Sequence, residues 1–214
     1  MHIVGIDLSG PSNIVDTVAV VYRVSESGLF HHLTLEGAGD EAIIDLVARL
    51  LDEGPVAVGL DAPLSYNPGG GHRQSDKELR KLTSAAGMKP GSVMPPTLNR
   101  MIYLTARGIS IARALESLSG NRLKIVEVHP GATLALRGAL ISSVLSMKSE
   151  IDSRRELVRW LDSQNVPEVT EMKNPTDHYV AACAAALSAW KWSNNEAVWI
   201  HPARPPLHPY DFAA

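Results

Sequence analysis

Two short apolar runs that each end in an aspartate constrain the fold of this chain most strongly. HIVGID ends at Asp7 and VAVGLD ends at Asp61. Neither run alternates apolar and polar residues, which is typical of central strands buried on both faces of a sheet. An unpartnered carboxylate at the end of a buried strand is energetically costly or becomes protonated. We therefore expect both aspartates to have a ligand or a specific partner.

The order of the predicted elements brings these two runs together. Two further strands follow the first, at about residues 17–24 and 29–37, and their short connections favour an antiparallel meander. An amphipathic helix over residues 39–54, capped by Asp40, then leads into the VAVGLD strand. A strand reached through a helix tends to pair parallel with an earlier one. Asp7 and Asp61 should then lie at the same edge of the sheet, where ligands gather in such folds.

The second half of the chain adds helices and one more strand. We expect a short helix at 75–86, a helix at 98–118, a strand at 122–128 and one or two helices over 133–164. Asn174 as cap with Pro175 at the first helical position should open the last helix. The tail, residues 201–214, contains too much proline for regular structure. The sequence thus predicts one α/β domain over 1–214, with a mixed five-stranded sheet and helices on both faces.

Charge is distributed unevenly along the chain. The net charge is −3, yet the segment 65–100, an irregular insertion around a short helix, carries six basic and two acidic side chains, a net of +4. This basic segment suits a phosphate-bearing ligand, although a solvated helix face explains it equally well. The single cysteine, Cys183, indicates no disulfide, and no apolar run reaches the length of a membrane span. We expect a cytoplasmic protein with no membrane partner.

Four acidic residues are candidates for one metal site. Asp7 and Asp61 would repel each other unless a cation lay between them, and magnesium commonly binds one or two carboxylates with waters and substrate phosphates. Glu127 shares a strand face with His129, and Asp177 falls in the first turn of the last helix. Each has a purely structural alternative: an Asx turn for Asp7, a loop cap for Asp61, an edge-strand surface position for Glu127, and a helix-capping role for Asp177.

Six motifs in order along the chain resemble the DUF429 family, which is described as predicted nucleases with a ribonuclease H-like fold. The motifs are VGIDLSG, VGLDAPL, HRQSDKELR, IVEVHPGA, Lys148 with Arg154-Arg155, and DHYVAACAAALSA. The resemblance implies a sheet of order 3-2-1-4-5 whose second strand is antiparallel to the others. It also implies a divalent-metal site formed by Asp7, Asp61, Glu127 and Asp177.

The resulting hypothesis is a nuclease that uses two Mg²⁺ or Mn²⁺ ions and contacts the backbone of nucleic acid, with the second ion left open by the valine at position 180. The four acidic residues would be catalytic and would bind the metal. The expected phosphate-binding residues are Arg73, Lys77, Arg80 and Lys148, and the expected proton-transfer residues are His129 and His178. Two other functions stay open: a non-catalytic binding module with the same fold, which Val180 favours because related resolvases often have an aspartate there, and, less favoured, an actin-like ATP phosphotransferase. A homodimer also stays open.

Overall fold

The computed structural model describes residues 1–214 except 27, 119–120 and 168–173. Its centre is a mixed sheet with the strand order β3-β2-β1-β4-β5-β7-β6. The strands are β1 (His2–Asp7), β2 (Val18–Ser25), β3 (Gly28–Glu36), β4 (Val56–Asp61), β5 (Leu123–Val128), β6 (Ile200–His201) and β7 (Phe212–Ala213). β1 pairs parallel with β4, and β4 pairs parallel with β5, so these three strands end at the same edge.

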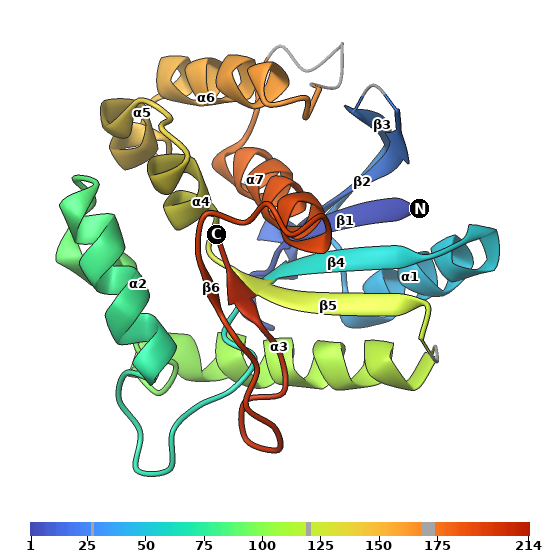
Figure 1. Cartoon of the computed structure of the whole chain (residues 1–214), viewed down its shortest axis with the longest axis horizontal. Helices are drawn as coiled ribbons and strands as arrows, with labels where there is room; N and C mark the ends of the chain where they lie inside the picture. Colours follow the sequence, from blue (N-terminus) through green and yellow to red (C-terminus); the bar gives the residue numbers. More distant parts are fainter. Residues whose placement is uncertain (27, 119–120, 168–173) are drawn as a thin grey trace.

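Helices cover both faces of the sheet (Figure 1). One face carries α1 (Asp40–Glu53) and α3 (Asn99–Leu118), and the other carries α7 (Asp177–Ser193). Against α7 pack α4 (Pro130–Leu136) and α6 (Ile151–Ser163), and α5 (Ile141–Ser146) packs against α4 and α6. α2 (Gln74–Ala85) contacts α4 beyond the edge of the sheet, and short 3₁₀ turns lie at Ile14–Asp16 and Pro90–Ser92. None of the helices in the described part of the chain is both long and apolar enough to span a membrane.

Each strand of the centre contributes to two separate cores because its side chains alternate between the faces. In β1, Ile3 packs into the core beneath α7, whereas Val4 and Ile6 pack into the core beneath α1 and α3. The apolar stripe of α1, which includes Ile43 and Leu50, closes that second core. Burial on both faces explains why these strands are apolar without alternation.

Two glycines allow α7 to lie unusually close to the sheet. A Cβ atom at Gly5 of β1 would lie 2.1 Å from the carbonyl oxygen of Ala182, and one at Gly59 of β4 would lie 2.5 Å from that of Ala185. Any larger residue at either position would have to push the helix away. The contact fixes the helix over β1 and β4, so the first turn of α7 stays next to the carboxyl ends of both strands.

The sheet is larger than predicted. The five longer strands lie in the order β3-β2-β1-β4-β5, with β2 antiparallel to both neighbours, but two short strands extend the sheet to seven. Both come from the C-terminal segment: β7 pairs parallel with β5, and β6 pairs antiparallel with β7. The prediction of five strands and of a tail without regular structure is therefore wrong. The prolines lie between the two strands, where no ladder hydrogen bond needs their missing N–H.

Some helix boundaries also differ from the prediction. α7 begins at Asp177, and its cap is Thr176, whose hydroxyl accepts a hydrogen bond of 3.0 Å from the Tyr179 amide, so Asn174 is not the cap. Gly39, not Asp40, precedes the first residue of α1. Three helices, α4 to α6, occupy the region expected to hold one or two. A serine, threonine or asparagine near a helix start is a common signal, but packing decides which one acts as the cap.

Candidate active site

Asp7 and Asp61 form a pair at the carboxyl ends of β1 and β4. They are directly opposite each other in the parallel register of the two strands. Both line a cavity of about 560 Å³ at this edge of the sheet. Burial of the Asp61 carboxyl raises its pKa well above the ordinary value, and the negative charge of Asp7 raises this pKa further. The structure therefore brings together the two residues whose repetition in the sequence suggested a site.

His178, in the first turn of α7, is the closest cationic partner of this pair. Its Nδ1 atom lies 2.7 Å from Oδ2 of Asp7, and its Nε2 atom lies 3.6 Å from Oδ2 of Asp16 and 3.9 Å from Oδ1 of Asp177. The hydrogen bond to Asp7 is the main cause that raises the pKa of His178 above its ordinary value. His178 thus orients the Asp7 carboxylate and supplies positive charge beside it.

Asp177 lines the same cavity from the start of α7. Its side chain is partly exposed, and it contributes a third carboxylate near Asp7 and Asp61. Its position at the first residue of a helix also favours a negative charge there because the helix dipole is positive at that end. Because Thr176 is the cap and Asp177 is the first helical residue, the predicted capping role at the third helical position is wrong. The metal-binding role of Asp177 stays a prediction.

Glu127 has a different environment from the other three acidic residues. Its carboxylate is 4% exposed and accepts two hydrogen bonds from Arg73, at 2.5 and 2.7 Å, and one of 2.9 Å from the Leu64 amide. Arg73 is equally buried, and it also donates to Asp76 at 2.6 Å and to the Ser65 hydroxyl at 3.1 Å. A guanidinium with donors on both edges suits two carboxylates at once.

This buried cluster changes two of the predicted roles. The Glu127 carboxylate lines the cavity, but Arg73 and a backbone amide already neutralise and satisfy it, so it is a poor metal ligand in this arrangement. Arg73 itself is engaged by Glu127 and Asp76, so it does not serve as the phosphate ligand that the sequence suggested. Its nearby charges raise the pKa of the guanidinium beyond its ordinary value. Arg73 instead links the basic insertion to β5.

His129 also differs from its predicted role in proton transfer. Its Nδ1 atom accepts a hydrogen bond of 3.2 Å from the Ala132 amide, which leaves Nε2 to donate to the Ser92 carbonyl at 3.0 Å. Burial lowers the pKa of His129 below its ordinary value, which favours the neutral ring. Because both ring nitrogens are hydrogen-bonded, His129 caps α4 and holds the 3₁₀ turn at Pro90–Ser92 next to it.

Among the predicted phosphate-binding residues, Lys148 is the one best placed. It is exposed, it lines the cavity, and its positive charge counteracts the rise in the pKa of Asp61. Lys89 and Arg100 from the basic insertion are exposed at the same cavity. Lys77 and Arg80 lie on α2 and are not part of the cavity lining in the described chain. The basic insertion therefore contributes cations to the cavity, but they come from the residues that follow α2 and not from α2 itself.

Arg107 is a buried residue of the site region that the sequence analysis did not single out. From α3 it donates to the Ser9 carbonyl and the Thr17 hydroxyl, both at 2.8 Å, to the Ala38 carbonyl at 3.0 Å, and to Asp40 at 2.7 Å. These bonds hold the turn that follows Asp7. A lone arginine in a helix gives no signal in sequence, because its partners lie 67 to 98 residues away.

The donor set fits one divalent cation but not a preformed cluster. No group of three or more histidine, cysteine or acidic side chains in the described residues is arranged to hold a metal ion. Two carboxylates are available in Asp7 and Asp61, which lie opposite each other in the sheet and line the same cavity, so a cation there would relieve their repulsion. Mg²⁺ is commonly bound in this way, with waters or substrate oxygens as its other ligands.

The fold and the site together define a mixed α/β protein with paired aspartates at the carboxyl edge of its sheet, inside a cavity bordered by cations. The chain belongs to the DUF429 family, a family of proteins of unknown function, whose model matches residues 5–206. This match confirms the family that the six sequence motifs indicated. A search of curated proteins finds no match to the chain.

Proposed function

We propose that this protein is a nuclease that hydrolyses phosphodiester bonds of nucleic acid with Mg²⁺ or Mn²⁺. The observation that carries the proposal is the pair of Asp7 and Asp61, in register on adjacent parallel strands and open to one cavity. Burial raises the pKa of Asp61, and the neighbouring charge of Asp7 raises it further because two close carboxylates repel each other once both are ionised. A divalent cation bound between them would remove this repulsion.

The fold supports the same proposal. We infer that the sheet is ribonuclease H-like, because its five longer strands have the order β3-β2-β1-β4-β5 and β2 runs antiparallel to its neighbours. In this interpretation, β6 and β7 are additions at the β5 edge. The resemblance of the six motifs to predicted nucleases of this fold agrees with the placement of the acidic pair.

Each residue of the site would have a distinct role. Asp7 and Asp61 would hold the ion, with Asp177 near enough to bind one of its waters. A bound divalent ion would polarise the scissile phosphate and lower the pKa of a water ligand. His178 would keep the Asp7 carboxylate in position through its 2.7 Å hydrogen bond. Lys148, together with Lys89 and Arg100, would bind phosphate oxygens.

We propose one ion for this site, not two. Asp7 and Asp61 are the available ligands, whereas a second ion would need the Glu127 carboxylate, which Arg73 neutralises. Separating Glu127 from Arg73 would break a buried ion pair and leave Glu127 with the Leu64 amide as its remaining described partner. Calorimetric titration of wild type with Mg²⁺ or Mn²⁺ should give one site that Asp7→Asn abolishes. A stoichiometry of two ions per chain would contradict this assignment.

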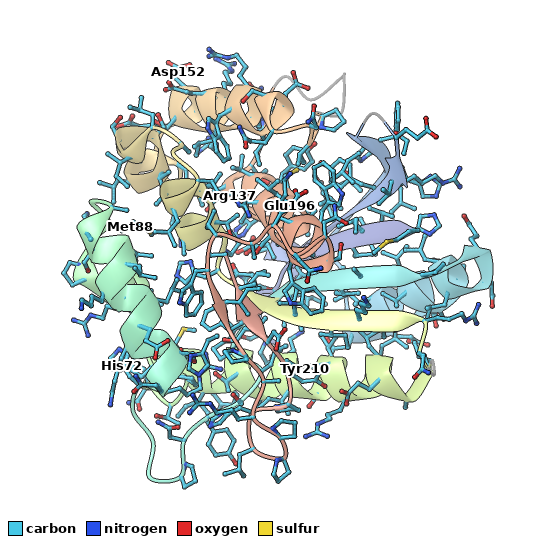
Figure 2. The ribbon with its side chains drawn as sticks, viewed as in Figure 1. His72, Met88, Arg137, Asp152, Glu196 and Tyr210 are labelled. Carbon is cyan, nitrogen blue, oxygen red and sulfur yellow. The ribbon has the colours of Figure 1, made fainter. Side chains whose placement is uncertain are left out.

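The decisive experiment is cleavage of labelled single-stranded, duplex, hybrid and branched oligonucleotides with and without Mg²⁺ or Mn²⁺. Wild type should give metal-dependent products, and Asp7→Asn should give none. Asp152→Asn is the matched control, because this aspartate lies on the exposed face of α6, away from the cavity (Figure 2). Absence of products from every substrate with wild-type protein would overturn the nuclease proposal.

A non-catalytic binding module is the second candidate. The lack of a three-residue ligand cluster among the described residues and the valine at position 180 favour it. In that case the oligonucleotides would bind without being cleaved, and binding would not depend on metal. Hydrolysis of ATP, added in place of the oligonucleotides under the same conditions, would instead favour the actin-like phosphotransferase.

A further inference from the structure

The cavity that holds the acidic pair also has an apolar, sulfur-rich part in its lining. Four of the six methionines of the chain line the cavity: Met88, Met94, Met101 and Met147. Met88 and Met147 are buried, whereas Met94 and Met101 are half-buried and accessible from the cavity. Val93 and Leu104 continue this surface.

These methionines come from separate elements that the fold brings together. Met88 follows α2, Met94 follows the 3₁₀ turn at Pro90–Ser92, Met101 lies in α3, and Met147 ends α5. Met88 lies between α2 and α4 (Figure 2), where its methyl group would be 3.0 Å from a Cβ placed on Gly131. The methionines therefore reach the lining of the cavity from four separate segments, and Met88 and Met147 are also part of the core beneath α7.

A thioether wall suits a flat aromatic ligand. Methionine sulfur is polarisable and makes favourable contacts with aromatic rings, and the unbranched side chain adapts to ligands of different shape. Phe212 is the aromatic side chain of the lining, but its ring stacks against the Arg73 guanidinium at 5.5 Å. Aromatic and basic residues alternate at Trp190-Lys191-Trp192, but none of these three lines the cavity. Methionines can provide the apolar surface instead.

The charges of the cavity add a second requirement for the ligand. Lys89, Arg100 and Lys148 are exposed at the lining, so an anionic group is favoured beside them. The acidic pair lies in the same cavity and would be bridged to that anion by a cation. A ligand that carries both a phosphate and an aromatic ring matches the methionines through its ring and the basic side chains through its phosphate, and a cation would link that phosphate to the acidic pair. A cavity of about 560 Å³ is within the usual range for a small-molecule site.

We propose that the cavity binds one nucleoside phosphate, with the phosphate at the lysines and the acidic pair and the base against Met94 and Met101. This inference rests on the proposed nuclease function and specifies its substrate: a base enclosed by protein cannot stay stacked in a duplex. The nucleoside phosphate belongs either to a free nucleotide or to an unpaired strand end, where no base pair has to be broken first. Cleavage at such ends is then favoured over cleavage inside a duplex, where the base would first have to be flipped out of the stack.

The test compares ligands with and without a base. Binding of 5′-AMP and of ribose 5-phosphate to wild type is measured by calorimetry with Mg²⁺ and again with EDTA. 5′-AMP should bind more tightly than ribose 5-phosphate. Met101→Ser and Met94→Ser should each weaken 5′-AMP by about two- to tenfold and leave ribose 5-phosphate unchanged. Ile102→Ser is the matched control, since Ile102 neighbours Met101 in α3, is exposed and lies outside the lining.

The outcomes separate this inference from the nuclease proposal. Equal affinity for the two ligands, or equal losses for both in the methionine variants, overturns the base site even if oligonucleotides are cleaved. Selective loss of 5′-AMP binding supports the base site even if no substrate is cleaved. Melting temperatures of the variants check that they are folded.

A second experiment distinguishes the two sources of the ligand. It compares the binding of oligonucleotides that have a single-stranded end with that of blunt duplexes of the same sequence. If only 5′-AMP binds, the ligand is a free nucleotide. If the oligonucleotide with a single-stranded end also binds, the ligand is a strand end. Blunt duplexes that bind as tightly as the single-stranded ends overturn the inference.

Discussion

Replacement of Arg73 by methionine should destabilise the protein severely. The substitution keeps an unbranched apolar chain but removes the only charge that the described structure places between Glu127 and Asp76, both of which are about as buried as Arg73 itself. Removal of one partner from a buried ion pair costs roughly 3–5 kcal/mol, because it leaves the other charge buried and uncompensated. A domain of this size has a total stability of roughly 5–15 kcal/mol, so the loss is a large fraction of it.

The predicted loss can be measured by urea denaturation followed by circular dichroism. For a chain of this length, a loss of roughly 3–5 kcal/mol corresponds to a fall in melting temperature of roughly 6–20 °C. Arg155→Met is the matched control: this arginine is exposed on α6, and its 3.1 Å salt bridge to Asp152 is a surface pair worth at most about 1 kcal/mol.

If Arg73→Met lost no more stability than Arg155→Met at pH 7, the cluster would not be the energetic link between the insertion and β5, and the reasoning would be refuted.

Two further predictions concern the packing and the buried histidine. Gly5→Ala should lower the free energy of unfolding, measured by urea denaturation, by about 3 kcal/mol or more, because its Cβ would collide with the backbone of α7 at Ala182. Gly10→Ala, which has open space around it, is the control and should cost far less. Equal losses would contradict the close approach of α7 to the sheet. The pKa of His129 is lowered by burial, so its contribution to stability is lost as the pH falls below about 6.5, where the unfolded chain takes up the proton. His129→Asn, which keeps a cap acceptor, should lose less stability than the wild type between pH 7 and 5, and an unchanged pH profile would argue against the neutral, buried ring.

Local sequence signals accounted for the main elements of the fold. The uninterrupted apolar runs of β1 and β4, and the amphipathic stripe of α1, follow from burial on two faces and on one face respectively. The strands β6 and β7 were missed because each has two residues and lies beside prolines, so no periodicity is visible. Their pairing depends on the exposed edge of β5, which is a property of the assembled sheet.

The part of the site that lies at the strand ends was predictable from local sequence signals. Asp7 and Asp61 were recognisable because both follow apolar strands, and parallel pairing alone brings them into register. His178 was named only as one of two candidates for proton transfer, and its hydrogen bond to Asp7 depends on how closely α7 packs on Gly5. The methionine wall could not be inferred, because its four residues come from four different segments.

The sequence by itself determined which strands are buried and which carboxylates end them, because hydrophobic periodicity and strand termini are local properties of the chain. Only the tertiary structure decided which charges meet. Glu127 and Arg73 are 54 residues apart, and their pairing turns a predicted metal ligand and a predicted phosphate ligand into one buried ion pair. Electrostatic partners are chosen by distance in space and by burial, and neither is encoded in the spacing of residues along the chain.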